Sequence, residues 1–217
     1  NVHPSDWINP TPASNYHLVI VGAGTAGLVT AAAAAGLGAR VALIERDLMG
    51  GDCLNVGCVP SKSLIAAARF VANGQRGKKM GFSGANNPSI NFSEIMERMR
   101  KQRSQISPVD SANRFKALGV DVFFGRASFV DDQTISIQTP NEPTTQLKFK
   151  KAVIASGARA KIPELDGLDA GGDDGVAARG EAHVQGDEGR LAALLEPLEL
   201  LIGHRLQPTR AEVERGQ

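Results

Sequence analysis

The sequence predicts an α/β fold of the Rossmann-like class, with a parallel sheet and a small antiparallel β excursion. Three observations lead to this prediction. An apolar run at 17–21 is followed directly by a glycine-rich turn at 22–27 and then by a segment rich in small residues. A second apolar run at 40–44 follows and ends at Glu45. A strand, a glycine-rich turn, a helix and a second strand make the βαβ unit that binds dinucleotides beside parallel sheets.

The next elements follow from local signals along the chain. The first helix is expected at 28–37, because Gly38 can close a helix in the left-handed conformation. A second helix is expected to start around Pro60, since proline suits the first turn of a helix. The segment 74–91 is rich in glycine, asparagine and lysine and is expected to be a loop.

The second half of this domain is expected to be a helical stretch followed by short strands. Residues 92–118 have apolar side chains near helical spacing, and Pro108 predicts a kink or a break between two helices. The further strands are expected at 120–124, at 127–130, 134–138 and 146–149 in the antiparallel excursion, and at 152–155 as one more buried strand.

Composition argues against several classes of function. The chain has 217 residues, 42% of them hydrophobic, and a formal net charge of +1, which gives no electrostatic reason to expect nucleic acid or an acidic membrane as a partner. No apolar run approaches the roughly 18 residues that a membrane-spanning helix needs. Residues 1–15 are polar and rich in proline, unlike a signal or transit peptide. We therefore expect a cytoplasmic protein.

Charges and aromatic residues are unevenly distributed and predict a boundary near residue 167. Every aromatic side chain lies at or before Phe149, and residues 168–217 have a net charge of −5 whereas residues 1–167 have +6. We expect a polar N-terminal extension at 1–16, a dinucleotide-binding domain at 17–167, and a divergent, poorly folded tail at 168–217 with one amphipathic helix at 191–196.

Both cysteines lie in one short run at 50–62, with the sequence GGDCLNVGCVPSK. Cys53 and Cys58 cannot pair on one continuous helix, because that offset separates their Cα atoms and turns the side chains to different faces. They can pair if Cys53 lies in an irregular turn and Cys58 opens a helix, where the helix dipole favours the reactive thiolate. This arrangement predicts a redox dithiol. Buried, inert cysteines are the alternative, and no metal site is expected, because the four histidines have no ligand spacing with the pair.

The glycine-rich turn has the GxGxxG spacing of the dinucleotide fingerprint. Gly22 permits the tight turn, Gly24 lets a pyrophosphate approach the backbone, and Gly27 lets the helix lie close to the strand. The start of the helix then faces the phosphates. Glu45, 23 positions after Gly22, can accept hydrogen bonds from a ribose hydroxyl. A purely structural turn is the alternative.

Together these segments resemble the class I pyridine nucleotide–disulfide oxidoreductases, which include dihydrolipoamide dehydrogenase, glutathione reductase and mercuric reductase. The resemblance covers roughly residues 15–167 and is carried by 19–27, by Glu45 with Arg46, and by 50–62. The mercuric reductase-like branch is the most similar, as judged from the spacing and from residues 119–127.

The resemblance implies a flavoprotein, so that the bound dinucleotide is FAD and NAD(P)H is a co-substrate. It implies that Cys53 attacks the substrate and that Cys58 contacts the flavin ring. The cofactor-binding positions that it implies are Gly22, Gly24 and Gly27 at the pyrophosphate, Glu45 and Arg46 at the ribose end, Gly51, Asp52 and Lys62 along the flavin half, Gly125 and Ala127 near the adenine, and Ser156 and Gly157 in a turn where the family has Thr-Gly.

The implied reaction passes electrons from NAD(P)H through FAD and the dithiol to a disulfide or Hg(II), in a homodimer. A second GxGxxG unit, a late Gly-Asp and a His–Glu acid/base pair have no convincing counterpart, since 186–187 and 207–212 are only superficial matches. We therefore expect a truncated or frame-shifted product without NAD(P)H or dimer-interface domains. The alternatives are a non-catalytic FAD-binding remnant and a stand-alone dithiol redox module.

Overall fold

The computed structural model describes residues 1–81, 90–140 and 142–158. The chain divides into two units, and all of the described residues belong to the first. The predicted tail and the motif-like segments at 186–187 and 207–212 lie outside the described residues. Within the described ranges, no helix combines the length and the apolar character that crossing a membrane requires.

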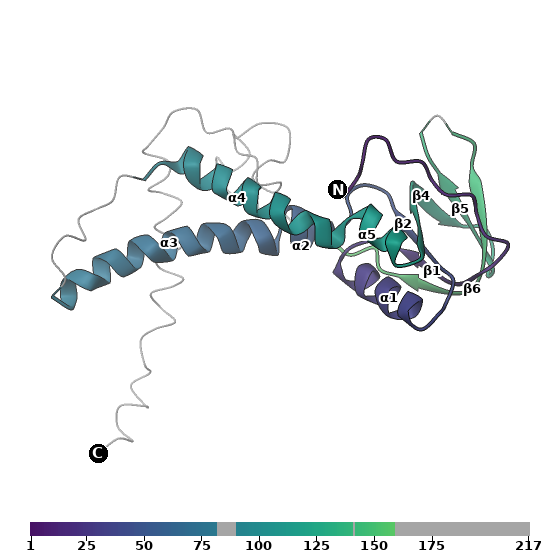
Figure 1. Ribbon diagram of the computed structural model, residues 1–217, viewed down its shortest axis with the longest axis horizontal. Helices are drawn as coiled ribbons and strands as arrows, with labels where there is room; N and C mark the ends of the chain where they lie inside the picture. The colour runs from purple at the N-terminus through teal and green to yellow at the C-terminus, as the bar shows by residue number, and fades with distance from the viewer. Residues whose placement is uncertain (82–89, 141, 159–217) are drawn as a thin grey trace, which may run out of the picture. The chain divides into compact units, whose positions relative to one another are not determined.

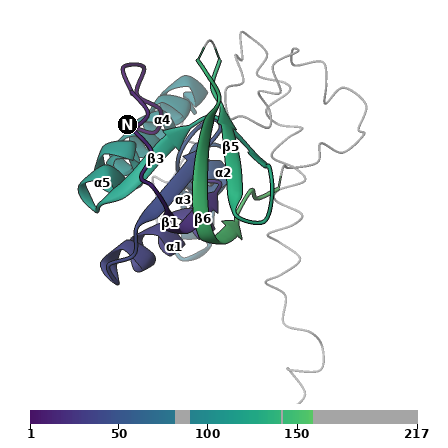
Figure 2. The ribbon, with the colours of Figure 1, turned by 90° about the vertical axis from the view of Figure 1, so that its right-hand side faces the viewer.

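The strands of this unit form one six-stranded sheet with the order β3-β2-β1-β6-β5-β4 (Figure 1). The pairs β3–β2, β2–β1 and β1–β6 are parallel, whereas β6–β5 and β5–β4 are antiparallel. Figure 2 shows β6 between β1 and β5, and its first half pairs with β5 while its second half pairs with β1. The strands are β1 (Tyr16–Val21), β2 (Val41–Glu45), β3 (Val120–Phe124), β4 (Arg126–Phe129), β5 (Thr134–Gln138) and β6 (Thr145–Ile154). The predicted α/β fold and its antiparallel excursion are confirmed.

Helices connect the parallel strands. α1 (Thr25–Gly36) leads from β1 to β2. The helical segments between β2 and β3 are α2 (Gly51–Asn55), α3 (Cys58–Lys79), α4 (Phe92–Ile106), the 3-10 helix η1 (Ser107–Asp110) and α5 (Ala112–Ala117). The break predicted at Pro108 is confirmed, because α4 ends at Ile106 and the proline lies in η1.

Three local predictions are wrong. α1 begins at Thr25 rather than at residue 28, because the last glycine of the fingerprint already lies in its first turn. α3 continues to Lys79, so residues 74–79 are helical, and the good helix formers after Gly74 offset the cost of the glycines. The stretches 146–149 and 152–155 belong largely to one strand, β6, whose end at Ile154 is 69% exposed, not buried. Only β1 pairs with that end among the described strands.

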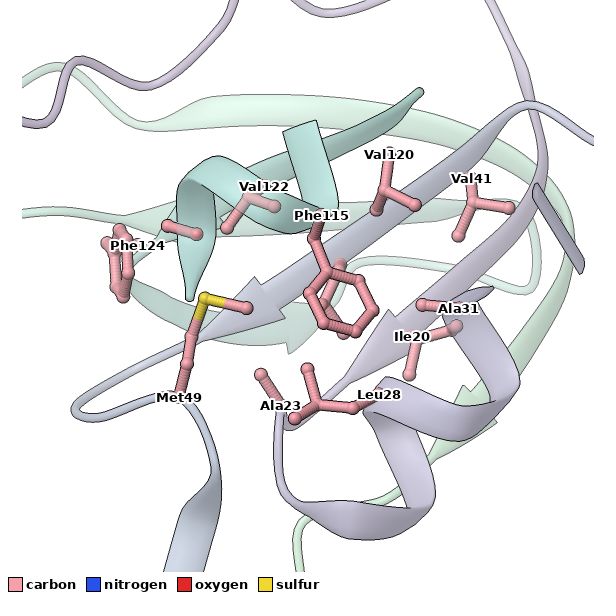
Figure 3. Close-up of a cluster of buried hydrophobic side chains, with 12 residues drawn as sticks. Ile20, Ala23, Leu28, Ala31, Val41, Met49, Phe115, Val120, Val122 and Phe124 are labelled. Atoms are coloured by element: carbon pink, nitrogen blue, oxygen red, sulfur yellow. The ribbon is translucent and has the colours of Figure 1, made fainter. Parts of the chain in front are cut away.

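Two hydrophobic clusters fill the two faces of the sheet, because side chains alternate along each strand. Figure 3 shows the first, in which Leu28 of α1 and Phe115 of α5 pack on Ile20 of β1 and Val122 of β3. The second cluster joins the opposite face to the antiparallel excursion, and contains Tyr16, Val19, Ala42, Ile44, Phe123, Ile135, Ile137, Leu147 and Phe149. The excursion therefore covers one face of the parallel sheet.

The N-terminal segment packs along β3, the end strand of the sheet. Asn9 Nδ2 donates to the Phe124 carbonyl at 2.9 Å, and Asn9 Oδ1 accepts from the Phe124 amide at 2.7 Å. Trp7 Nε1 donates to the Val122 carbonyl at 3.3 Å, and the His3 ring stacks on the Phe124 ring at 4.1 Å. Asn9 and Trp7 thus form hydrogen bonds with backbone groups of β3 that would otherwise be unpaired at the edge of the sheet.

Candidate active site

The predicted site residues gather where the parallel strands end. Gly22 follows β1, Glu45 is the last residue of β2, Gly125 follows β3, and Ser156 comes two residues after β6. Ligands of open α/β sheets bind outside the carboxyl ends of the strands, so this is the edge at which a dinucleotide is expected.

The fingerprint glycines are required by close backbone contacts. A Cβ on Gly22 would collide with the Ala155 carbonyl and would lie 3.2 Å from the Ser156 Cα, so the turn at 155–157 lies directly against the GxGxxG turn. A Cβ on Gly27 would collide with the Gly22 carbonyl. Gly22 also has φ +103°, which side chains rarely tolerate. The glycines therefore bring two loops and a helix start into one compact corner.

The start of α1 is open to a ligand. Gly24 is the N-cap and supplies no side-chain cap to the first N–H groups of the helix. Gly51, at φ +56°, crosses the chain here, since a Cβ on it would lie 2.7 Å from the Gly24 Cα. The crossing places the start of α2 beside the start of α1.

Glu45 is 9% exposed and is held by backbone donors on both sides. Its Oε2 accepts from the Ala23 amide at 2.7 Å and its Oε1 accepts from the Asp47 amide at 2.9 Å. Its backbone carbonyl accepts from the Gly125 amide at 2.8 Å. Because each carboxylate oxygen has two lone pairs, both can accept a further hydrogen bond.

The other predicted cofactor residues differ in exposure. Arg46, Asp52, Lys62, Ser156 and Gly157 are all exposed, and Ser156 and Gly157 belong to the turn that lies against the fingerprint. Gly125 is buried, at φ +155°, and a Cβ on it would lie 2.6 Å from Ile137 Cγ2. Ala127 packs against the second hydrophobic cluster rather than at the glycine corner. Gly125 is therefore joined to the site through the backbone of Glu45, whereas Ala127 belongs to the core below it.

The two cysteines belong to consecutive helices. Cys58 is the first residue of α3, as predicted, but Cys53 lies in the short helix α2 and not in an irregular turn. The pair does not lie on one continuous helix, because α2 ends at Asn55 and α3 begins at Cys58. The turn between them is tight, since a Cβ on Gly57 would lie 2.7 Å from the Asp52 carbonyl oxygen. Both residues are free thiols, Cys53 partly buried and Cys58 exposed.

A hydrogen bond between the two thiols and partial burial raise the pKa of Cys53. A hydrogen bond from the Thr25 side chain and the positive charge of Lys62 act in the opposite direction. The Cys53 thiol, next to Cys58 at the start of a long helix, therefore stays protonated to higher pH than a free cysteine. This arrangement is suited to thiol–disulfide exchange, in which one sulfur attacks and the other resolves.

Residues distant in sequence hold the segment between the cysteines. The Asn55 side chain donates to the carbonyls of Met49 at 3.1 Å and Gly51 at 2.9 Å. Arg103 on α4 donates to the Asn55 carbonyl at 3.1 Å. Sequence reasoning missed Thr25, Asn55 and Arg103. Thr25 and Asn55 lie inside the quoted motifs, but no local signal points to Arg103, which is 48 residues away from its partner.

No group of three or more metal-ligating side chains occurs in the part of the chain that the structure describes.

Comparison with known proteins shows that the chain is similar in sequence to disulphide oxidoreductases. The family model described as pyridine nucleotide-disulphide oxidoreductase matches residues 16–192. The dihydrolipoyl dehydrogenase of Bacillus subtilis is 37% identical over 141 residues, covering 65% of this chain and 29% of that protein. The mercuric reductase of Staphylococcus aureus is 32% identical over 154 residues, covering 71% of this chain and 27% of that protein.

A solved structure is similar over the same part. The Cu(II) complex of the HOCl-induced flavoprotein disulfide reductase RclA from Escherichia coli matches with a TM-score of 0.52 and 26% identity, over 72% of this chain and 32% of that one. The chain therefore spans less than a third of the length of each of these relatives.

Proposed function

The chain belongs to the pyridine nucleotide–disulphide oxidoreductase family, and on that premise we propose that it carries the FAD-binding and dithiol part of a flavin-dependent disulfide or mercuric reductase. The observation that carries the proposal is the crossing of Gly24 and Gly51, which places the start of α1 beside the helix of Cys53. A dinucleotide corner and a dithiol are thereby joined in one site.

The residues present fit FAD. The open start of α1, with its N-cap at Gly24, suits a pyrophosphate, because unpaired N–H groups and the helix dipole favour an anion there. Gly24 presents no side chain between its backbone and a phosphate, while Gly22 and Gly51 let neighbouring backbone pack closely around this corner. Glu45 would accept from the adenosine ribose with the lone pairs that its two amide partners leave.

When bound, FAD supplies the two-electron chemistry that links a nicotinamide donor to the dithiol. The chain's own residues then carry out the exchange. The Cys53 thiolate attacks one sulfur of a substrate disulfide, a mixed disulfide forms, and the substrate's other sulfur leaves as a thiolate that takes up a proton. Cys58 then displaces the second substrate thiol and forms the Cys53–Cys58 disulfide. Two electrons and two protons reach the substrate.

We propose a disulfide or Hg(II) as the electron acceptor and NAD(P)H as the donor. The relatives named flavoprotein disulfide reductase and mercuric reductase support these two acceptors, at 26% and 32% identity. The name dihydrolipoyl dehydrogenase, at 37% identity, denotes the opposite direction, in which a dithiol is oxidised. The exposed sulfur of Cys58 and the partly buried sulfur of Cys53 are soft ligands that suit a thiophilic metal ion as well as a disulfide. The cytoplasm, where thiols stay reduced, is the proposed location.

The absorbance spectrum of the purified 217-residue chain tests the cofactor proposal. Visible flavin bands that persist through gel filtration are expected, and a long-wavelength shoulder after dithiothreitol reduction would place a thiolate against the flavin ring. A Cys58→Ser variant should lose the shoulder and keep the flavin. A colourless chain that takes up no added FAD would contradict the proposal and favour the remnant or the stand-alone dithiol module.

A further inference from the structure

The first residues of the N-terminal segment reach the loop that leads from β2 into the dithiol helix α2. The carbonyl of Val2 accepts a hydrogen bond from the amide of Met49 at 3.0 Å. The Asn1 side chain donates to the Ser107 hydroxyl of η1 at 2.8 Å. Residues 1–9, which we call the strap, therefore connect β3 and η1 with the loop before the cysteines.

Met49 is the residue at which the strap meets the segment between the cysteines. Its amide donates to the strap, and its carbonyl accepts from the side chain of Asn55 at 3.1 Å. Asn55 is the last residue of α2 and lies between Cys53 and Cys58. The Met49 side chain is fully buried in the first hydrophobic cluster (Figure 3), against which Val2 also packs. A continuous series of contacts thus runs from the strap through Met49 to the dithiol segment.

The two ends of the strap contact different parts of the molecule. Trp7 and Asn9 form their side-chain hydrogen bonds with the backbone of β3 and with Thr139. Ile8 between them is 87% exposed. The far end therefore holds the edge of the sheet, whereas the end at Val2 holds the loop before the dithiol. This difference makes it possible to loosen either end separately.

We propose that the strap is a positioning segment of the dithiol site: through Val2 and Met49 it holds Asn55 in place and keeps the sulfur of Cys53 partly buried. The inference rests on the proposed role of the two cysteines as the redox pair. It assigns the N-terminal segment a task beyond covering β3, because release of its first residues would expose the thiol that meets the substrate.

Two measurements on the fully reduced chain test the inference. One is the rate of hydrogen exchange at the Met49 amide, and the other is the ratio of the iodoacetamide alkylation rates of Cys53 and Cys58. Val2→Gly removes the apolar contact beside the accepting carbonyl and gives the backbone more freedom there. Exchange at Met49 should become faster. The alkylation ratio should rise by about threefold, because a partly buried thiol reacts when its segment opens locally.

Ile8→Gly is the matched control, since it makes a similar change at an exposed position of the same strap. Val2→Ile keeps the apolar contact, and both variants should retain the original ratio. Asn9→Ala should lower the midpoint of urea unfolding, because it removes two hydrogen bonds to the backbone of β3, and should leave the ratio unchanged. If Val2→Gly does not fold, Val2→Ala takes its place with the same expected direction.

Three results would overturn the inference. The first is an unchanged exchange rate at Met49 in Val2→Gly, and the second is faster exchange with an unchanged alkylation ratio. The third is an equal rise of the ratio in Asn9→Ala, which would mean that any loosening of the strap exposes the thiol. Because neither measurement needs flavin, the outcome is independent of the spectral test of the proposed function.

Discussion

The GxGxxG turn after β1 and the dithiol segment after β2 are both glycine-rich starts of helices, yet they are held in different ways. The first is fixed by backbone contacts within its own turn and with the end of β6, where side chains on Gly22 or Gly27 would collide with carbonyl groups. The second has close backbone contacts of its own at Gly51 and Gly57, and in addition a side chain from α4 holds it, because Arg103 donates to the Asn55 carbonyl. The cofactor corner is a rigid part of the sheet, whereas the dithiol depends on the helices packed around it.

The largest effect is expected where a side chain would enter the rigid corner. Gly27→Val should destabilise the domain by about 3 kcal/mol or more, because the new Cβ would collide with the Gly22 carbonyl, which cannot move without shifting β1. Urea unfolding followed by the fluorescence of Trp7, the single tryptophan, measures this. Trp7 is a suitable probe because it contacts Val122 of β3.

Gly36→Ala is the control for this prediction. Gly36 lies in the same helix and has no atom within 4 Å of an added Cβ, so alanine should stabilise the domain by about 0.5–1 kcal/mol. Similar unfolding midpoints for the two variants would show that the corner is not rigid.

Removing the distant support should have a smaller effect on stability and a clear effect on the dithiol. Arg103→Met loses the charged hydrogen bond to the Asn55 carbonyl and should cost about 1.5 kcal/mol. It should also change the alkylation rates of both cysteines. Arg100→Met, on the same helix, removes only an exposed ion pair with Glu97 and should cost less than about 0.5 kcal/mol. If the two arginine variants behave alike, the dithiol segment does not depend on α4.

The next largest effect is expected on the reactivity of Cys53 when its partner Cys58 is replaced. The hydrogen bond to Cys58 is the largest cause that raises the pKa of Cys53. In Cys58→Ala that cause is gone, so the pKa of Cys53 should fall and its thiolate should persist to lower pH. Alkylation of Cys53 at neutral pH should therefore become faster, by about twofold to threefold. If the pH dependence of Cys53 alkylation were unchanged or moved to higher pH in Cys58→Ala, the hydrogen bond with Cys58 would not be what raises the pKa of Cys53.

The smallest effect is expected from Lys62. Its positive charge lowers the pKa of Cys53, but it is an exposed side chain on α3, so solvent and salt screen it. Lys62→Gln should slow alkylation of Cys53 by less than about twofold, and the difference should vanish in about 1 M salt. Lys150→Gln, an exposed lysine on β6, is the control. A large difference that survives in high salt would mean that Lys62 contacts the sulfur directly.

The fold could be predicted from the sequence because its determinants are local, and the same local motifs placed the candidate site residues at the carboxyl ends of the parallel strands. The βαβ unit, the antiparallel excursion and the break at Pro108 each follow from neighbouring residues, and the structure confirms them. Two sequence predictions failed for different reasons. The exposure of Ile154 depends on which strands pair beside it, whereas α3 extends further because the helix formers after Gly74 offset the cost of the glycines. The roles assigned to Cys53, Cys58 and the cofactor residues stay predictions until the spectra and alkylation profiles are measured.

The sequence by itself determined the strand-turn-helix of the fingerprint and the start of a helix at Cys58, since steric limits on glycine and proline act within a few residues. Only the tertiary structure decided that Gly51 packs against Gly24, that Arg103 holds the chain between the cysteines, and that the N-terminal segment covers β3. These contacts join residues up to 115 positions apart. They form because the packing of separate segments on the sheet brings these residues together. A pattern of neighbouring residues in the sequence does not predict such long-range contacts.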